Sequence, residues 1–336
     1  MQPAAEVPVE DFESLFHGDP REIEQRLRAL RPRAACHADP TLAPKIEARI
    51  ALTQAMQGRA AEARRTLEAA ELFPGASHPA ARIQLLIERG RVLHQSGQKP
   101  DACVVFVSAW EFASTHGLDG PAVDAAHMAA ITAVEPVAKV RWNRTALELA
   151  EASADPKARA WISVLHNNLA QAYIAAAQFT AAHESFQTCR ELASAENNSI
   201  IERGARWGIA RALRSLGRTT EALAMQQQVL SEYNRLEETA ALPVELIRMG
   251  RGLVHEELAQ LLTTEAPAHA ARALEDLSSC KWHLDTEYRD RWNTLARLAR
   301  QLPGFVFTNH IVYGPDSGPL RELEMSFSDT SERQTP

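Results

Sequence analysis

The 336-residue sequence is poor in the residues that usually mark a redox site, a metal site or a membrane segment. Its cysteines are dispersed and form no CxxC pair: Cys36, Cys103, Cys189 and Cys280. This pattern indicates reduced thiols and a cytoplasmic protein more than a disulfide framework or a zinc site. The longest apolar runs, such as residues 129–134, fall far short of the ~20 residues that a membrane helix needs. The first residues include acids and lack the basic start of a secretory signal.

An excess of basic residues is also missing. The sequence has 36 Lys and Arg against 43 Asp and Glu, for a net charge of -7. This balance argues against a nucleic-acid binder that works through bulk charge. We therefore expect neither a nucleic-acid partner nor a membrane partner.

Aromatic residues make up only 6% of the sequence, and β-branched residues are sparse, which argues against a large sheet. Ala, Leu, Arg, Glu and Gln dominate instead, and these residues favour helices. The length exceeds the roughly 250–300 residues of a single hydrophobic core. Together these features predict an all-α chain with either two domains or an elongated repeat array.

Small side chains recur along the chain at a nearly constant spacing. Six segments follow one another at a spacing of 39 and then 40 residues, beginning at Pro44, Ile83, Val123, Ser163, Arg203 and Pro243. The eighth residue is small in every segment: Ala51, Gly90, Ala130, Ala170, Ala210 and Gly250. The twentieth residue is small in four of five: Ala63, Ala102, Ala182 and Ala222, with Trp142 as the exception. Such a pattern predicts stacked helical hairpins whose two helices approach closely at these positions.

The turn inside each hairpin has its own signal. The fifteenth residue is glycine in three segments, Gly58, Gly97 and Gly217. Glycine adopts a left-handed backbone without strain, so it can end the first helix of a hairpin. Larger residues at neighbouring positions, such as Tyr173 and Phe186, are expected to fill the space around the close contact.

At these positions the sequence resembles the tetratricopeptide repeat (TPR) family. The match is clearest at Asn168 to Tyr173 followed by Ala182, Phe186 and Ala193, and again at Gly208, Ile209, Ala210, Leu213, Gly217 and Ala222. The resemblance covers about residues 42–280 and implies a right-handed superhelix of about six hairpins, in a long-period variant with a degenerate third copy. HEAT repeats also run about 40–47 residues. They are the second choice, because the small–small contact and the turn glycine favour TPR.

The two ends depart from the repeat. We expect residues 1–41 to form a loose leader, with a short amphipathic piece, and then a capping helix. Residues 42–281 form the repeat array, and residues 282–302 form a C-terminal capping helix with an apolar stripe. Residues 303–336 are expected to begin as an extended segment and to continue as a disordered polar tail.

No catalytic motif is present in the sequence. The segment from His255 to Ala259 begins like a metalloprotease helix but lacks the second histidine. Gly250 and Gly252 stand inside a predicted helix rather than after a strand, so they are not a nucleotide fingerprint. We expect no enzyme activity, no metal and no cofactor. An enzyme whose site is assembled across helices stays open as an alternative.

The resemblance places a ligand groove on the first helices of the hairpins, at positions 2, 5, 9, 12 and 13. These positions supply the candidate ligand-binding residues Arg91, His94, His127, Asn167, Gln171, Trp207, Arg211, Arg214 and Arg251. Arginine binds carboxylates bidentately, and tryptophan can anchor an apolar side chain. We therefore expect a protein-interaction scaffold or adaptor that binds a peptide or helix, acidic or C-terminal in character. The competing interpretation is a solvated face whose arginines pair with nearby acids such as Glu88 and Glu135.

The sequence bears on three further interpretations. The family's carboxylate clamp, which grips chaperone C-termini, is mostly absent: only Asn168 fits, and Ile131 and Gly208 stand where other clamp residues belong. A bacterial regulatory sensor for a small molecule or short peptide is an alternative function. Residues 316–336 carry more acids than bases, and we expect a solubilising tail, with occupation of the groove by this tail as the alternative.

Overall fold

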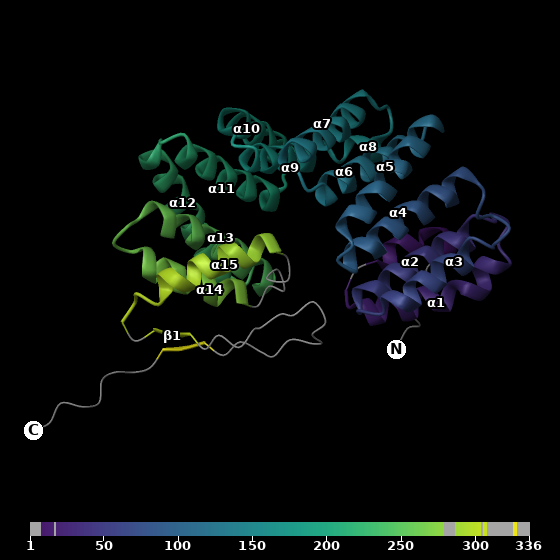
Figure 1. Ribbon diagram of the computed structural model, residues 1–336, viewed down its shortest axis with the longest axis horizontal. Coiled ribbons are helices and arrows are strands. Elements are labelled where there is room, and N and C mark those ends of the chain that lie inside the picture. Colours follow the sequence, from purple (N-terminus) through teal and green to yellow (C-terminus); the bar gives the residue numbers. More distant parts are fainter. Residues whose placement is uncertain (1–7, 17, 279–285, 304, 308–324, 328–336) are drawn as a thin grey trace, which may run out of the picture. The chain divides into compact units, whose positions relative to one another are not determined.

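The structure, a computed structural model, describes residues 8–16, 18–278, 286–303, 305–307 and 325–327. The described part packs as two compact units, which divide between Gln178 and Phe179. Within each unit, consecutive helices pack side by side (Figure 1). The all-α architecture expected from the composition is confirmed. Cys280 and most of the predicted tail lie outside the described residues.

The first unit contains a short 3-10 helix and nine α-helices in its described part. Their bounds are η1 Val9–Leu15, α1 Pro20–Ala35, α2 Leu42–Met56, α3 Ala60–Ala70, α4 Pro79–Gln95, α5 Lys99–Thr115, α6 Asp119–Thr132, α7 Pro136–Ala152, α8 Pro156–Arg159 and α9 Ile162–Ala175. The second unit contains α10 Phe179–Ala195, α11 Ser199–Ser215, α12 Thr219–Glu238, α13 Val244–Leu261, α14 Ala266–Ser278 and α15 Thr286–Ala299. Two short strands, β1 Phe305–Phe307 and β2 Met325–Phe327, complete its description.

The recurring small residues are buried, as the hairpin argument requires. Ala51 and Ala63 are fully buried in one core cluster between α2 and α3. A Cβ atom at Gly90 on α4 would lie only 2.5 Å from Cε1 of Phe106 on α5. Because no side chain fits there, the backbone of α4 at Gly90 packs directly against the Phe106 ring of α5. The period of small residues therefore marks the real helix–helix contacts.

The turns also form as expected. Gly58, Gly97 and Gly217 have φ values of 77°, 77° and 79°, in the region that favours glycine. The fourth segment has alanine at the same position, and Ala177 adopts φ 56°. The turn geometry is thus retained even where its preferred residue is missing.

The degenerate third copy differs because its turn comes earlier. Helix α6 ends at Thr132, and Pro136 begins α7, where the missing backbone N–H costs nothing. Trp142 is buried and meets Trp110 of α5 edge-on, with ring centroids 5.2 Å apart. A bulky pair therefore fills the space that small residues occupy in the other copies.

The short amphipathic piece expected in the leader, at residues 12–16, falls within η1 and the residue after it. In η1, Val9, Phe12 and Leu15 are buried against apolar residues of α1 and α2. Apolar residues at every third position thus bury one side of this short helix.

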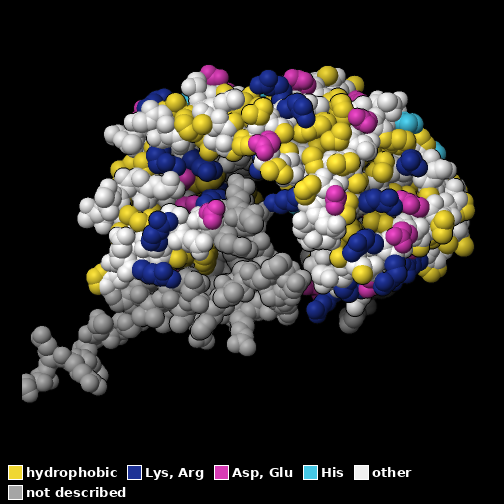
Figure 2. Space-filling model, viewed as in Figure 1, with side chains coloured by type: hydrophobic (Ala, Val, Ile, Leu, Met, Phe, Trp, Pro, Cys, Tyr) yellow, Lys and Arg dark blue, Asp and Glu magenta, His cyan; other side chains and the backbone are white. Residues whose placement is uncertain are grey.

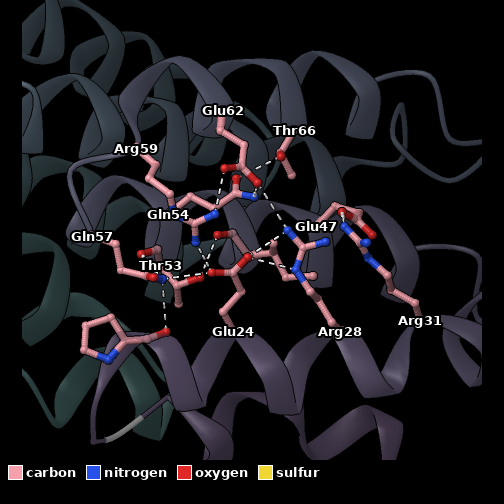
Figure 3. A network of polar contacts seen from close by, with 12 residues as sticks. Glu24, Arg28, Arg31, Glu47, Thr53, Gln54, Gln57, Arg59, Glu62 and Thr66 are labelled. Atoms are coloured by element: carbon pink, nitrogen blue, oxygen red, sulfur yellow. Dashed lines mark hydrogen bonds and ion pairs between the residues drawn. The ribbon is translucent and has the colours of Figure 1, made fainter.

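Helix α1 also caps the repeats through a polar network, shown in Figure 3. Glu24 accepts hydrogen bonds from Arg28 and from Gln57, both at 2.8 Å, and also pairs with Arg59. Burial opposes ionisation of this carboxyl, but the hydrogen bonds and the two arginine charges outweigh it and lower the pKa of Glu24. Gln57 and Arg59 flank the turn between α2 and α3, so the network joins three helices.

At the C-terminal end, α15 packs its apolar stripe on α14, with Leu295, Ala296 and Ala299 buried. This confirms the amphipathic helix expected there. Strand β1 lies in the predicted extended segment, whereas β2 lies in the stretch predicted to be disordered and pairs with β1 antiparallel. That part of the tail prediction is wrong, because residues 325–327 find a partner strand upstream.

Candidate functional site

In the first unit, the predicted groove residue Arg91 is an internal cross-link between helices. Its Nη1 donates to Glu88 Oε1 at 2.7 Å, and its Nη2 donates to both carboxylate oxygens of Asp124 on α6, at 2.9 and 2.8 Å. Burial opposes the charge, but the two carboxylates outweigh it and raise the pKa of Arg91. Arg91 thus donates hydrogen bonds to Glu88 on its own helix α4 and to Asp124 on α6.

This cross-link belongs to a longer chain of alternating charges. Glu88 is fully buried, and its Oε1 also accepts from Arg49 Nη1 on α2 and from Gln84, each at 2.8 Å. Arg49 pairs in turn with Glu13 of η1 at 2.6 Å. We call this series, Glu13–Arg49–Glu88–Arg91–Asp124, the charge ladder. The pairing of Arg91 with Glu88 is the one that the competing interpretation expected.

The remaining predicted residues of the first unit are partly or wholly buried. His127 is 8% exposed, and its ring lies 5.3 Å from that of Trp161. Burial is the main cause that lowers the pKa of His127, so the ring is neutral near pH 7. His94 is half-buried on α4. Asn167 and Gln171 are half-buried one turn apart on α9, where Asn167 donates to Asn168 at 3.4 Å.

In the second unit, Arg211 and Arg214 line a cavity of about 400 Å³ between α11, α13 and α15. Arg291 of α15 lines it as well, as do the neutral polar residues Gln260 and Thr294. Its apolar wall consists of Ala259, Leu295 and Leu298, and Asp290 is exposed at its edge. We call this space the arginine cavity.

Two buried carboxylates lie beneath these three arginines. Glu257 pairs with Arg214 Nε at 2.8 Å and with Arg211 Nε at 3.4 Å, and Glu256 accepts from Arg291 Nε at 2.6 Å. The carboxylate side chains are only 2% and 6% exposed, against 23–25% for the three arginines. The three guanidinium groups are therefore more exposed than the two carboxylates beneath them, although Glu256 also lines the cavity.

The electrostatics of Arg211 reflect this crowding of positive charge. The pKa of Arg211 is lowered, and burial is the largest cause. The charges of Arg291 and Arg214 also lower this pKa, whereas Glu257 and Glu256 oppose the shift.

Trp207 has a different place from the one predicted. Its Nε1 donates to the backbone oxygen of Leu253 at 3.1 Å, and its ring packs against Val254 and Leu258. The Arg211 guanidinium lies over this ring, 5.6 Å from the centroid. Trp207 thus lies beneath Arg211, and the apolar surface of the arginine cavity comes from Leu295 and Leu298 of α15 and from Ala259 of α13.

Arg251 faces a separate cavity of about 590 Å³ between α12, α13 and α14. Its guanidinium makes two bonds of 2.7 Å to Asp276, and it also pairs with Glu237. His255 and His269 line the same space with their Nδ1 atoms 2.8 Å apart. Burial, reinforced by the nearby positive groups, lowers the pKa of His255 to about 3. We call this space the histidine cavity.

The structure thus brings Arg211 and Arg214 together and assigns Arg251 to another cavity. Sequence reasoning missed Arg291, because α15 was interpreted only through its apolar stripe. It also missed Glu256 and Glu257, although two adjacent acids on a helix of the predicted repeat array were a usable signal.

On the face shown in Figure 2, basic and acidic side chains are interspersed. Among the described residues, the helices all fall short of the length and apolarity that a membrane crossing demands. The same part of the chain holds no cluster of three or more His, Cys, Asp or Glu side chains suited to a metal ion.

No family model matches the sequence, and no curated protein matches it either. Solved structures do match. The apo form of RapI aligns with a TM-score of 0.61 and 12% identity, over 87% of this chain and 83% of that one. NprR in complex with its cognate peptide NprX aligns with a TM-score of 0.53 and 13% identity, over 87% and 83%.

A signal transduction ATPase of the STAND class with a tetratricopeptide repeat sensor, from Pyrococcus horikoshii, aligns with a TM-score of 0.58 and 11% identity. The alignment covers 87% of this chain and 45% of that one. At these identities the likenesses show the fold alone. That fold is a TPR-like array of helical hairpins, as the sequence resemblance implied.

Proposed function

We propose that this protein is a non-catalytic regulatory adaptor that binds a peptide on its first helices, with the arginine cavity as the main contact. The observation that carries the proposal is the position of Arg211 and Arg214. Both were predicted to line a peptide groove, and both lie with Arg291 around one cavity. NprR, which shares the fold, is seen with its cognate peptide bound.

The chemistry of the arginine cavity supports an acidic ligand. Its lining includes three guanidinium groups, which are more exposed than the carboxylates of Glu256 and Glu257 that they pair with; Asp290 is a further acid of the lining. Arginine remains protonated in proteins and neither gives up nor accepts a proton readily. The lining therefore favours recognition of a carboxylate over proton-transfer catalysis.

The proposal is tested by affinity selection with the full chain and a pool of random twelve-residue peptides. We expect peptides containing Asp or Glu to be enriched, and we expect the enrichment to disappear in the double variant Arg211→Met, Arg214→Met made on a Glu257→Gln background. The background change is needed because Glu257 is buried and pairs with both arginines, so its charge would otherwise be left alone.

The matched control is Arg248→Met with Arg297→Met, which removes two exposed arginines from α13 and α15 of the same unit. This control should retain the enrichment. If both double variants select the same peptides as the unaltered chain, the arginine cavity is not the binding site.

A second candidate function is the sensing of a small polar molecule, and the histidine cavity is the observation that favours it. This cavity is larger, at about 590 Å³, and its lining includes Asn234, Arg272 and Glu275. A panel of small polar compounds screened by thermal shift tests the idea. A compound that binds there should lose its effect in Arg272→Met and keep it in Arg211→Met.

A further inference from the structure

Exposed aliphatic side chains gather at one end of α5, α6 and α7. In the described part of the first unit, six large hydrophobic side chains are exposed, and four of them belong to this end. They are Val104, Ile131, Val134 and Val137, with exposed fractions of 67%, 41%, 70% and 71%. We call them the aliphatic patch. Such a patch on a protein surface is typical of a site where another molecule docks.

Helix packing brings these four side chains together. Residues 116–118 join α5 to α6, residues 133–135 join α6 to α7, and the consecutive helices pack on each other. Because both turns are short, α5 and α7 each run opposite to α6 and parallel to one another. The thiol of Cys103, near the start of α5, donates to the backbone oxygen of Ala129, near the end of α6, at 3.8 Å. The starts of α5 and α7 and the end of α6 are thus neighbours.

The hairpin fold does not require aliphatic side chains at this place. The corresponding turns of the two preceding hairpins are residues 57–59 and 96–98, with the sequences Gln-Gly-Arg and Ser-Gly-Gln. In the third copy the turn is residues 133–135, with the sequence Ala-Val-Glu, and Pro136 and Val137 follow it. Exposed valines therefore stand where the other turns are polar, and their exposure means that they contribute little to the core.

The two outer helices carry opposite charges beside the patch. Each presents its patch valine and then two exposed residues on the same face, four and seven positions later. These residues are Ser108 and Glu111 on α5, and Arg141 and Arg144 on α7. Because the spacing is the same on both helices, the face of α5 is complementary in charge to the face of α7. A second copy of the chain offers both faces at once.

We propose that two copies of this chain associate through the aliphatic patch, with α5 of each copy lying along α7 of the other. The symmetry operation is a two-fold axis midway between α5 and α7 and parallel to them. It places Val104 against the partner's Val137 and Glu111 against the partner's Arg144, with the partner's Arg141 one turn nearer to the valines. Two-fold symmetry makes each of these contacts twice.

The other charges near the contact are compatible with this arrangement. Asp101 and Glu135 are exposed at the outer end of the patch. The two-fold axis brings these acids toward each other at the solvated rim, where charge interactions are worth little. Arg144 donates to the neutral hydroxyl of Tyr173 at 2.8 Å, and Glu148 acts on its charge from one turn away. Arg141 is therefore the better position for a charge test.

Sedimentation equilibrium of the full chain tests the association. We expect a reversible dimer with a dissociation constant of about 1–100 μM, as suits a small contact. Val137→Asp should raise this constant about tenfold or more, because a charge enters the apolar contact twice. An acid suits the first turn of α7, so the fold should be kept. The control is Leu72→Asp at an 86% exposed position outside the patch, which should leave the constant unchanged.

A charge exchange between copies tests the pairing of α5 with α7. Glu111→Arg and Arg141→Glu should each weaken the dimer about threefold or more, because like charges then meet across the contact. An equal mixture of the two variants should form mixed dimers about as tightly as the unaltered chain. In a mixed dimer, one contact has both charges reversed and the other keeps its original charges. Rescue in the mixture cannot come from an interaction within one copy.

Each other outcome overturns the proposal. A chain that stays monomeric up to about 1 mM does not pair through the patch, which then serves a partner of another kind. A dimer that Val137→Asp leaves unchanged uses another surface. A dimer that needs Val137 but is not restored in the mixture has a different arrangement of helices. The arginine cavity belongs to the second unit, so peptide capture by Val137→Asp tests the proposed function separately.

Discussion

The two units use arginine at the same repeat position in different ways. Arg91 and Arg211 both stand at the ninth position of a first helix. In the first unit, the second position of the next repeat is Asp124, which receives two bonds from Arg91. In the second unit that position is Val244, and Arg211 instead shares the deeper Glu257 with Arg214.

This difference shows how one acid decides what a repeat arginine does. In the first unit the acid is at the start of the neighbouring first helix, and the arginine becomes part of the charge ladder. In the second unit the acid is Glu257, further along the neighbouring first helix α13, and Arg211 shares it with Arg214 at the arginine cavity. What a repeat arginine does in this array thus depends on where its partner acid lies, more than on where arginine occurs.

The largest effect is expected when the charge ladder loses its central acid. Glu88→Ala removes the acceptor that Arg49 and Arg91 share; because Arg49 keeps Glu13 and Arg91 keeps Asp124, we expect a loss of about 3 kcal/mol of unfolding free energy, the low end for breaking a buried pair. Urea unfolding, with hydrogen exchange followed in each unit, measures it. Glu71→Ala is the control, because Glu71 and Arg89 are 46% and 40% exposed and their pair is worth about 0–1 kcal/mol. Equal costs would show that the ladder contributes little.

The comparison between the ninth-position arginines is tested directly by Arg91→Met and Arg211→Met. We expect about 2–3 kcal/mol of destabilisation for Arg91→Met, because the hydrogen bonds to Asp124 are lost. Arg211→Met should cost less than about 1 kcal/mol, because Glu257 keeps Arg214. Thermal unfolding of both variants measures this, and the opposite order would refute the distinction between the units.

Acid should weaken the second unit through the histidine cavity. The pKa of His255 is lowered to about 3, against about 6.5 in an unfolded chain. Below pH 6.5 the unfolded chain therefore binds the proton and the folded one does not, so stability falls as the pH falls. The loss is about 2 kcal/mol by pH 5, measured as unfolding midpoints from pH 7 to pH 5.

The matched variants for the acid effect are His255→Gln and His127→Gln. The pKa of His127 in the first unit is also lowered by burial, so each variant should flatten the pH dependence of its own unit. A slope that neither variant changes would assign the acid sensitivity to other groups.

Replacing the glycine that contacts a buried phenylalanine ring should destabilise both units to a similar extent. A Cβ at Gly208 would lie 2.3 Å from Cε1 of Phe186 in the second unit, as Gly90 meets Phe106 in the first. Gly208→Ala and Gly90→Ala should each cost about 1–3 kcal/mol by crowding. Gly204→Ala, on the same helix with no atom within 4 Å, should instead stabilise by up to about 1 kcal/mol. A stabilising Gly208→Ala would contradict the close contact.

The smallest effect concerns the turns. Ala177 holds φ 56° where other copies have glycine, so Ala177→Gly should stabilise its turn by about 0.5 kcal/mol. Gly217→Ala in the second unit should cost about 1 kcal/mol for the same reason. Differential scanning calorimetry of the two variants should show melting shifts of opposite sign.

The repeat was predictable from sequence because its signal is local and periodic. Ala51 and Ala63 are twelve residues apart and pack in one core, so spacing alone locates them. The third copy was less predictable, because Trp142 is accommodated by Trp110 from the preceding hairpin. Spacing within one repeat carries no information about such a partner.

The candidate site was predictable only in part. Spacing placed Arg211 and Arg214 on one face, and they do share a cavity. It did not show that Arg91 is bound to Asp124, 33 residues away, or that Arg291 comes from the last helix. Charge compensation between distant helices depends on tertiary packing, which no local pattern encodes.

The helices of this array are long for their fold, and that length has a consequence for anything lying along them. Helices α5, α7, α10 and α11 each contain 17 residues, about 25 Å at 1.5 Å per residue. An extended chain advances about 3.3–3.6 Å per residue. A strand laid parallel to α11 would therefore need about seven residues to run from one end of the helix to the other.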